Sequence, residues 1–327
     1  MRIKETVLCA VLAVFLLSGV CPAGVFAQEA AFPTKPITII VPFPPGGFLD
    51  LGARTIGESL SRELKTPVVV ENKAGGAGLV GSLAFLNTKP DGYTLLAASG
   101  AAVISSVQLA KNPTFDPRKD LLPLAYLGDT PGVMAVGKHT PFKTFNEFVQ
   151  YAKANPGKLK GAISGLGGEA HIMFETIESD AKLDSKLVPY PAIQGVITGI
   201  LGGHLDWWCG TLPGVMQFQK SGDMRILLAT RKIAELPGVP SGADVGLPDV
   251  SVNVWMGLFA NPKTPKEVTD KLIAAVAKAV KDPEVAKKLS GTGFTLAYKP
   301  PAELAKLITA HWGLYDKVLK DAKIKAN

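Results

Sequence analysis

The segment from residue 37 to residue 60 constrains the fold most, because it joins a strand to a helix through a stiff loop. Ile37-Thr-Ile-Ile-Val41 is a continuous apolar run, which is typical of a buried parallel strand. Pro42-Phe-Pro-Pro-Gly-Gly47 interrupts this run, and we expect Asp50 to open a helix over residues 51–60. In a doubly wound α/β sheet, such a junction lies at the carboxyl end of a strand, where these folds bind ligands.

Two interpretations of this loop are open. Gly46 and Gly47 let the backbone approach a ligand closely, and the free N–H groups ahead of the helix suit an anion. Alternatively, the prolines only stiffen a turn in which Asp50 serves as a plain N-cap. The residues of the loop alone favour neither interpretation.

Apolar strands and amphipathic helices alternate along the rest of the chain. We expect strands over residues 67–71, 93–98, 133–137, 160–164, 187–190, 205–209, 225–230 and 254–260. We expect helices over residues 78–86, 103–110, 144–155, 262–281 and 302–322, and Thr144 with Glu147 forms a capping pair. This alternation predicts an α/β fold, and the length of the chain suits two domains.

The N-terminus has the features of a signal peptide over residues 1–27. Arg2 and Lys4 precede an apolar run over residues 7–17, and the small residues near Ala27 suit cleavage before Gln28. The run is too short to span a bilayer, which takes about 20 residues. Cys21 lies in a near match to a lipoprotein box, but the bulky Val20 argues against a lipid anchor. Export to the periplasm would leave Cys209 as the one thiol, buried and without an internal disulfide.

Several classes of function find no support in the sequence. The net charge of +7 is spread without a Lys/Arg cluster, so we expect no nucleic acid partner. Gly76-Ala-Gly-Leu-Val-Gly81 matches a dinucleotide-binding pattern, but the next strand lacks the acidic residue, so we expect no cofactor. The four histidines lack metal-ligand spacing and no nucleophile elbow is present, so we expect neither a metal site nor an enzyme.

A second glycine loop, Gly165-Leu-Gly-Gly-Glu-Ala-His171, follows the strand predicted at residues 160–164 and precedes an apolar helix at residues 172–179. It repeats the arrangement of the first loop, with glycines at a strand end and backbone N–H groups at a helix start. Two such loops from two α/β units could face each other across a cleft. The alternative is that they are two unrelated glycine turns.

The chain resembles the Bug proteins, the periplasmic substrate-binding receptors of tripartite tricarboxylate transporters. The matching segments run in order over most of the chain after residue 27: Pro42–Gly47 with Asp50 and Ala53-Arg54, Val69–Gly78, Pro90–Leu96, Val188-Pro-Tyr190 and Leu201–Asp206.

The resemblance implies a type II periplasmic-binding-protein fold, in which two doubly wound α/β domains are joined by two crossover segments around a ligand cleft. The first domain would take residues 28–132 plus 258–327, and the second would take residues 133–257. A ligand carboxylate would be held mainly by backbone N–H groups. The residues expected at the ligand are Phe43, Pro45, Gly46, Gly47, Phe48, Asp50, Ser99, Ser164, Gly165, Gly167, Gly168, His171, Tyr190 and Trp208.

The resemblance also implies a monomer that delivers a small carboxylate to membrane permease subunits. Two alternatives stay open: a ligand receptor for a sensor kinase, and a periplasmic hydrolase that uses the same cleft. Catalysis by the second would need a nucleophile and base that the sequence does not display.

Departures from the family pattern bear on the ligand. Gly168 stands where the family usually has Ser or Thr, and Pro191-Ala192 replaces a common Lys-Gly pair. Phe48 is larger than its usual counterpart, and Trp207 and Trp208 alternate across a strand. These changes predict a monocarboxylate, or a dicarboxylate with a large apolar or aromatic body. The alternative is that Phe48 and both tryptophans are packing residues.

Overall fold

The computed structural model describes residues 32–112, 115–190, 192–290 and 292–321. Residues from Lys35 onward form one compact unit, which contains both sheets. The predicted signal peptide with Cys21 lies outside the described residues, as does Pro191. No helix in the described part of the chain is long and apolar enough to cross a membrane.

The first sheet has six strands in the order β2 (Val68–Asn72), β1 (Ile37–Val41), β3 (Thr94–Ala98), β10 (Val254–Ala260), β4 (Leu122–Thr130) and β11 (Thr295–Lys299). β1 pairs in parallel with β2 and β3, which confirms the prediction of a parallel strand from its apolar run. β10 is antiparallel to both of its neighbours.

The second sheet has five strands in the order β7 (Lys186–Tyr190), β6 (Lys160–Ser164), β8 (Trp207–Thr211), β5 (Gly132–Gly137) and β9 (Met224–Ala229). β6 is parallel to β7 and β8, whereas β5 is antiparallel to β8 and β9. Both sheets therefore place three parallel strands beside one inserted antiparallel strand. The predicted fold class of two doubly wound α/β units is confirmed.

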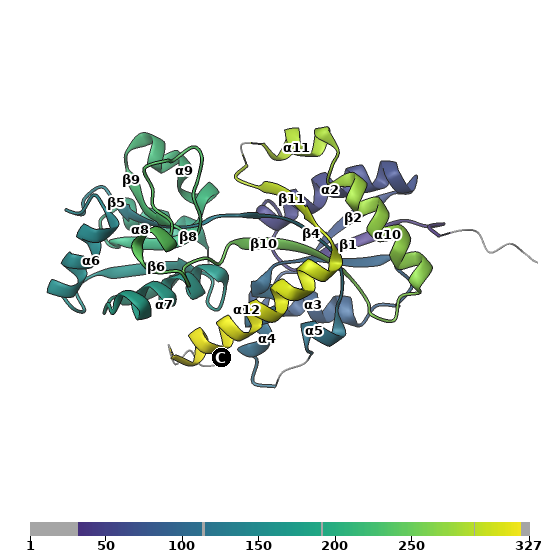
Figure 1. The fold of residues 1–327 in the computed structure, drawn as a ribbon, viewed down its shortest axis with the longest axis horizontal. Helices are drawn as coiled ribbons and strands as arrows, with labels where there is room; N and C mark the ends of the chain where they lie inside the picture. Colours follow the sequence, from purple (N-terminus) through teal and green to yellow (C-terminus); the bar gives the residue numbers. More distant parts are fainter. Residues whose placement is uncertain (1–31, 113–114, 191, 291, 322–327) are drawn as a thin grey trace, which may run out of the picture. The chain divides into compact units, whose positions relative to one another are not determined.

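The chain changes sheet twice. It passes from β4 to β5 between Thr130 and Gly132, and it returns between the end of β9 at Ala229 and the start of β10 at Val254. Figure 1 shows β4 with β5, and β10, running between the two sheets. We call the first sheet with its helices the first lobe and the second sheet with its helices the second lobe. The division into domains at residues 132 and 258 remains a proposal.

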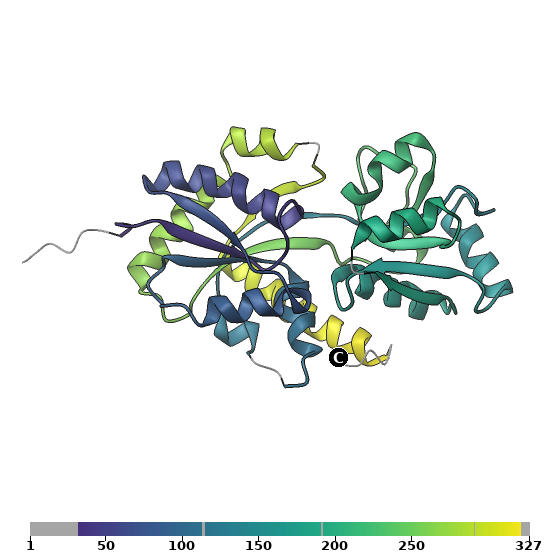
Figure 2. The same cartoon turned by 180° about the vertical axis from the view of Figure 1, so that it is seen from behind.

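Helices cover both sheets (Figures 1 and 2). Those of the first lobe are α2 (Phe48–Leu64), α3 (Leu79–Leu86), α4 (Ser106–Gln108), α5 (Pro117–Asp120), α10 (Lys266–Ala279), α11 (Pro283–Leu289) and α12 (Pro301–Asp321), with the short turns η1 (Gly76–Gly78) and η2 (Ala101–Ser105). Those of the second lobe are α6 (Phe145–Ala154), α7 (Glu169–Ala181), α8 (Ile193–Leu201), α9 (Leu212–Ser221) and the turn η3 (Ala243–Val245).

The helix after the first glycine loop begins earlier than the sequence predicted. α2 starts at Phe48 with Gly47 at the N-cap, so Asp50 lies in its first turn and is not the cap. Phe48 stabilises this early start because its ring stacks on Phe294, with centroids 4.7 Å apart. A tertiary contact 246 positions along the chain is not visible in local sequence.

Candidate functional site

One cavity lies between the two sheets, at the carboxyl ends of the three parallel strands of each sheet. From the first lobe it is lined by Phe43 after β1, Ala77 after β2 and Ala101 after β3. From the second lobe it is lined by the residues that follow β6, by Ile193 after β7 and by the end of β8, and its volume is about 200 Å³. Carboxyl ends of parallel strands are the usual ligand site of α/β sheets.

The second glycine loop forms one wall of this cavity. Gly165 and Gly167 have φ angles of +86° and +76°, a region that glycine adopts at little cost. The Gly165 N–H donates to the Tyr190 carbonyl at 2.9 Å, and the Gly167 N–H donates to Nδ1 of His171 at 3.0 Å. These two bonds fold the loop so that Gly168, the N-cap of α7, lines the cavity.

The start of α7 gives this wall backbone N–H donors, beside the buried carboxylate of Glu169. Gly168, Glu169 and Ala170 all line the cavity, and the first backbone N–H groups of a helix lack partners within the helix. The helix dipole places roughly half a positive charge at this end. An anion with an exposed carboxylate could therefore bind here without a cationic side chain.

The first glycine loop is held mainly by contacts within its own lobe. The Asp50 carboxylate accepts hydrogen bonds from the Gly46 N–H at 2.8 Å, from Arg54 Nε at 3.1 Å and from Asn72 Nδ2 at 2.9 Å. Burial acts to raise the pKa of Asp50, but the bonds from Arg54, Gly46 and Asn72 outweigh it, so the pKa lies below its ordinary value. The Asp50 carboxylate therefore holds the first glycine loop against the start of α2 and against Asn72.

The structure brings only part of the predicted site residues to the cavity surface. Those that line it are Phe43, Ser164, Gly165, Gly168 and Trp208. The other predicted residues lie outside its lining: Pro45, Gly46, Gly47, Phe48, Asp50, Ser99, Gly167, His171 and Tyr190. Tyr190 and His171 support the second loop through the two hydrogen bonds given above.

Nine lining residues were not expected from the sequence: Ala77, Ala101, Leu166, Glu169, Ala170, Ile193, Gly210, Thr211 and Val254. A sequence pattern could have found part of this set. Thr211 ends β8 and is followed by Pro213 in the first turn of α9, so it marks a third strand-to-helix junction at the same sheet edge.

Trp207 and Trp208 point to opposite faces of the second sheet, as predicted from their alternation. Trp207 stacks on Phe174 at 4.3 Å between ring centroids and belongs to the core beneath α7. Trp208 is fully buried and lines the cavity beside Gly210. A Cβ on Gly210 would overlap the Trp208 ring, so the glycine leaves room for the indole in the cavity wall.

The described residues that line the cavity are mainly apolar and include no cationic side chain. Phe43, Leu166, Ile193, Trp208 and Val254 supply most of its hydrophobic surface, and no Lys, Arg or His is among the lining residues. Within the described residues, no group of three or more His, Cys, Asp or Glu side chains is placed to hold a metal ion. The arrangement is suited to a small ligand with an anionic end and an apolar body.

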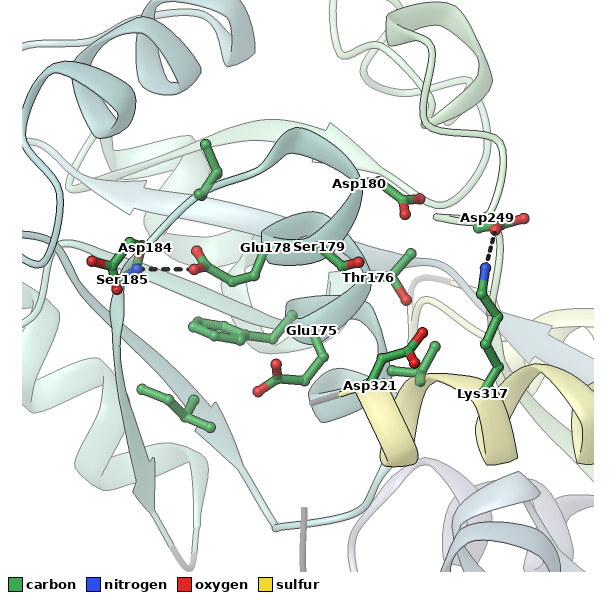
Figure 3. Close-up of a pocket in the computed structure, with 14 residues that line it drawn as sticks. Glu175, Thr176, Glu178, Ser179, Asp180, Asp184, Ser185, Asp249, Lys317 and Asp321 are labelled. Atoms are coloured by element: carbon green, nitrogen blue, oxygen red, sulfur yellow. Dashed lines mark hydrogen bonds and ion pairs between the residues drawn. The ribbon is translucent and has the colours of Figure 1, made fainter. Parts of the chain in front are cut away.

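A second and larger cavity of about 360 Å³ has the opposite electrostatic character (Figure 3). Carboxylates surround it: Glu175, Glu178, Asp180, Asp184, Asp249 and Asp321, with Lys317 paired to Asp249 at 3.8 Å. Burial, with repulsion from Glu175 and Asp184, raises the pKa of Glu178. An anionic ligand would be repelled here, so the smaller cavity is the better candidate for a carboxylate site.

Comparison with known proteins identifies the family. A family model described as the tripartite tricarboxylate transporter family receptor matches residues 52–323. The chain belongs to this receptor family. The resemblance to the Bug proteins is confirmed, since BugT of Bordetella pertussis is 28% identical over 325 residues, covering 98% of this chain and 99% of BugT.

Solved structures of receptors share the fold. A structure described as a periplasmic transporter is 35% identical to this chain, with a TM-score of 0.80. The match covers 91% of this chain and the full length of the transporter chain. MatC from Rhodopseudomonas palustris, solved with bound malate, is 27% identical with a TM-score of 0.75, covering 88% of this chain and all of MatC. The chain is thus a solute-binding receptor with the type II periplasmic-binding-protein fold.

Proposed function

We propose that this receptor is exported to the periplasm, captures a small carboxylate in the cavity between its two lobes and delivers it to a membrane permease. The observation that supports this best is the first turn of α7, whose residues Gly168, Glu169 and Ala170 line a cavity with apolar walls and no cationic side chain. Backbone N–H groups in a site shielded from water bind an anion more strongly than they would in solution.

The apolar walls indicate the body of the ligand. Leu166, Ile193 and Trp208 from the second lobe oppose Phe43 and Ala101 from the first lobe. A ligand with an aliphatic or aromatic body would bury apolar area against both lobes, at about 25 cal/mol per Å². Since these contacts need both lobes, the ligand would favour a closed arrangement over an open one.

Calorimetry with the protein from Gln28 onward tests the proposal. The panel contains aliphatic monocarboxylates, aromatic monocarboxylates, malate and citrate, and the expected result is tightest binding by acids with an apolar body. Tightest binding by malate or citrate would contradict the apolar character of the site, and absence of binding by every carboxylate would contradict the proposed function.

Two further measurements separate the alternatives. Recovery of the bound acid unchanged after long incubation is expected of a receptor, whereas conversion to a product would favour a hydrolase. Ligand uptake that depends on a neighbouring permease pair is expected for transport. Ligand-dependent activity of a sensor kinase without uptake would favour signalling.

A further inference from the structure

Glu169 is an acidic side chain buried in the wall of the ligand cavity. It is the first residue of α7 in the second lobe, and only 6% of it is exposed. Its Oε1 accepts a hydrogen bond from the Ala101 N–H of the first lobe at 2.9 Å, and the Gly100 N–H, the Ser99 hydroxyl and the backbone N–H of Glu169 itself also donate to this carboxylate. The donors that follow β3 are therefore already occupied by a carboxylate of the protein.

The surroundings of Glu169 leave its charge without a cationic partner. In the part of the chain that the structure describes, no Lys or Arg lines the cavity. A Cβ on Gly100 would lie 2.8 Å from Tyr315 Oη and 3.3 Å from both Glu169 Oε1 and Trp255 Nε1, so these groups close tightly around the contact. Burial raises the pKa of Glu169 against the opposing effect of its hydrogen bonds, as expected for a desolvated carboxylate without a cation.

We propose that Glu169 determines specificity by excluding a second ligand carboxylate, so that this receptor selects monocarboxylates with an uncharged body. The inference rests on the proposed function, since it names the class of carboxylate that the same cavity takes. A ligand carboxylate at the α7 N-terminus can place its body against the apolar walls. A second carboxylate that reaches the first lobe would find the donors after β3 already occupied by the Glu169 carboxylate and would be repelled by its charge.

Hexanoate and adipate provide the test, because they have the same chain length and differ by one carboxylate. Calorimetry with the wild-type protein at pH 7.5 is expected to show at least tenfold tighter binding of hexanoate, about 1.4 kcal/mol in binding free energy. Glu169→Gln keeps the shape of the side chain and removes its charge. It is expected to reduce the preference for hexanoate at least fivefold, mainly by tighter adipate binding.

Asp180→Asn is the matched control, since it removes one negative charge from the exposed end of the same helix. This variant is expected to keep the wild-type ratio of the two affinities. Equal affinities of the wild-type protein for hexanoate and adipate would overturn the inference without any variant, and so would an unchanged ratio in a folded Glu169→Gln protein. Failure of the wild-type protein to bind any carboxylate would overturn the proposed function and this inference together.

Discussion

Asp50 shows how one buried charge can stabilise a loop next to a ligand site. The side chain is 3% exposed and accepts hydrogen bonds from the Gly46 N–H, Arg54 and Asn72. An amide in its place keeps one acceptor oxygen and puts an NH2 group where the other oxygen was, so some of these buried donors lose their acceptor. Loss of such a partner typically lowers the free energy of unfolding by about 1–3 kcal/mol.

We therefore expect Asp50→Asn to lower the free energy of unfolding by about 1–3 kcal/mol at pH 7, measured by urea denaturation. The pKa of Asp50 is lowered on folding, so its contribution is present above the unfolded pKa of about 4 and is lost as the pH falls through the folded pKa. The difference between the two proteins should therefore shrink at pH 3. Asp270→Asn, at an exposed ion pair with Lys266, should change stability by less than about 1 kcal/mol. A difference for Asp50→Asn that persists undiminished at low pH would contradict this account.

At the scale of the elements, helix α6 allows the effect of a mutation on stability to be measured apart from its effect on ligand binding. Its N-cap Thr144 accepts a hydrogen bond from the Glu147 N–H at 3.2 Å, and Glu147 Oε2 accepts one from the Lys143 N–H at 2.6 Å. This confirms the capping pair expected from the sequence. None of the α6 residues lines the ligand cavity.

Thr144→Ala should lower the free energy of unfolding by about 1 kcal/mol, because the Glu147 N–H loses its acceptor. The ligand affinity should stay unchanged, which calorimetry can measure alongside thermal unfolding. Thr144→Ser keeps a capping hydroxyl and should remain close to wild type. A change in affinity without a change in stability would show that α6 is coupled to the site.

The sequence predicts elements well where one physical preference dominates. The runs at residues 160–164 and 254–260 coincide with β6 and β10, because continuous apolar stretches favour buried strands. The edge strand β11 was not predicted, since Thr295–Lys299 is only partly buried and pairs through tertiary contacts. Helix α8, which begins at Ile193, was also not predicted, and its N-terminus has no capping side chain that would mark it.

The candidate site was also predicted only where local sequence carries the signal. Ser164, Gly165 and Gly168 were expected because glycines after a strand mark a strand-to-helix junction. Ala101 and Val254 carry no chemical mark in the sequence, and they line the cavity only because of where the sheets place them. Glu169 could be noticed in the sequence, but its contact with Ala101 depends on the packing of the two lobes.

At the scale of the whole molecule, a hydrogen-bonded group joins the segments that pass between the lobes. Asp129, near the end of β4, accepts hydrogen bonds from Tyr126 Oη at 2.6 Å, Arg231 Nη2 at 2.9 Å and Asn253 Nδ2 at 3.1 Å. Arg231 follows β9 in the second lobe, and Asn253 directly precedes β10. One carboxylate thus fixes the outgoing and the returning segments to each other.

Asp129→Ala should weaken the coupling between the lobes, because the three donors around the carboxylate lose their acceptor. We expect the free energy of unfolding to fall by about 1–3 kcal/mol. In scanning calorimetry, the ratio of calorimetric to van't Hoff enthalpy should be higher than in the wild-type protein, since weakly coupled lobes unfold less cooperatively. Lys138→Ala breaks an exposed ion pair with Asp223 within the second lobe and should leave this ratio unchanged. A variant that unfolds with the wild-type ratio would show that the lobes are coupled through other contacts, of which the bond between Glu169 and the Ala101 N–H is the first to examine.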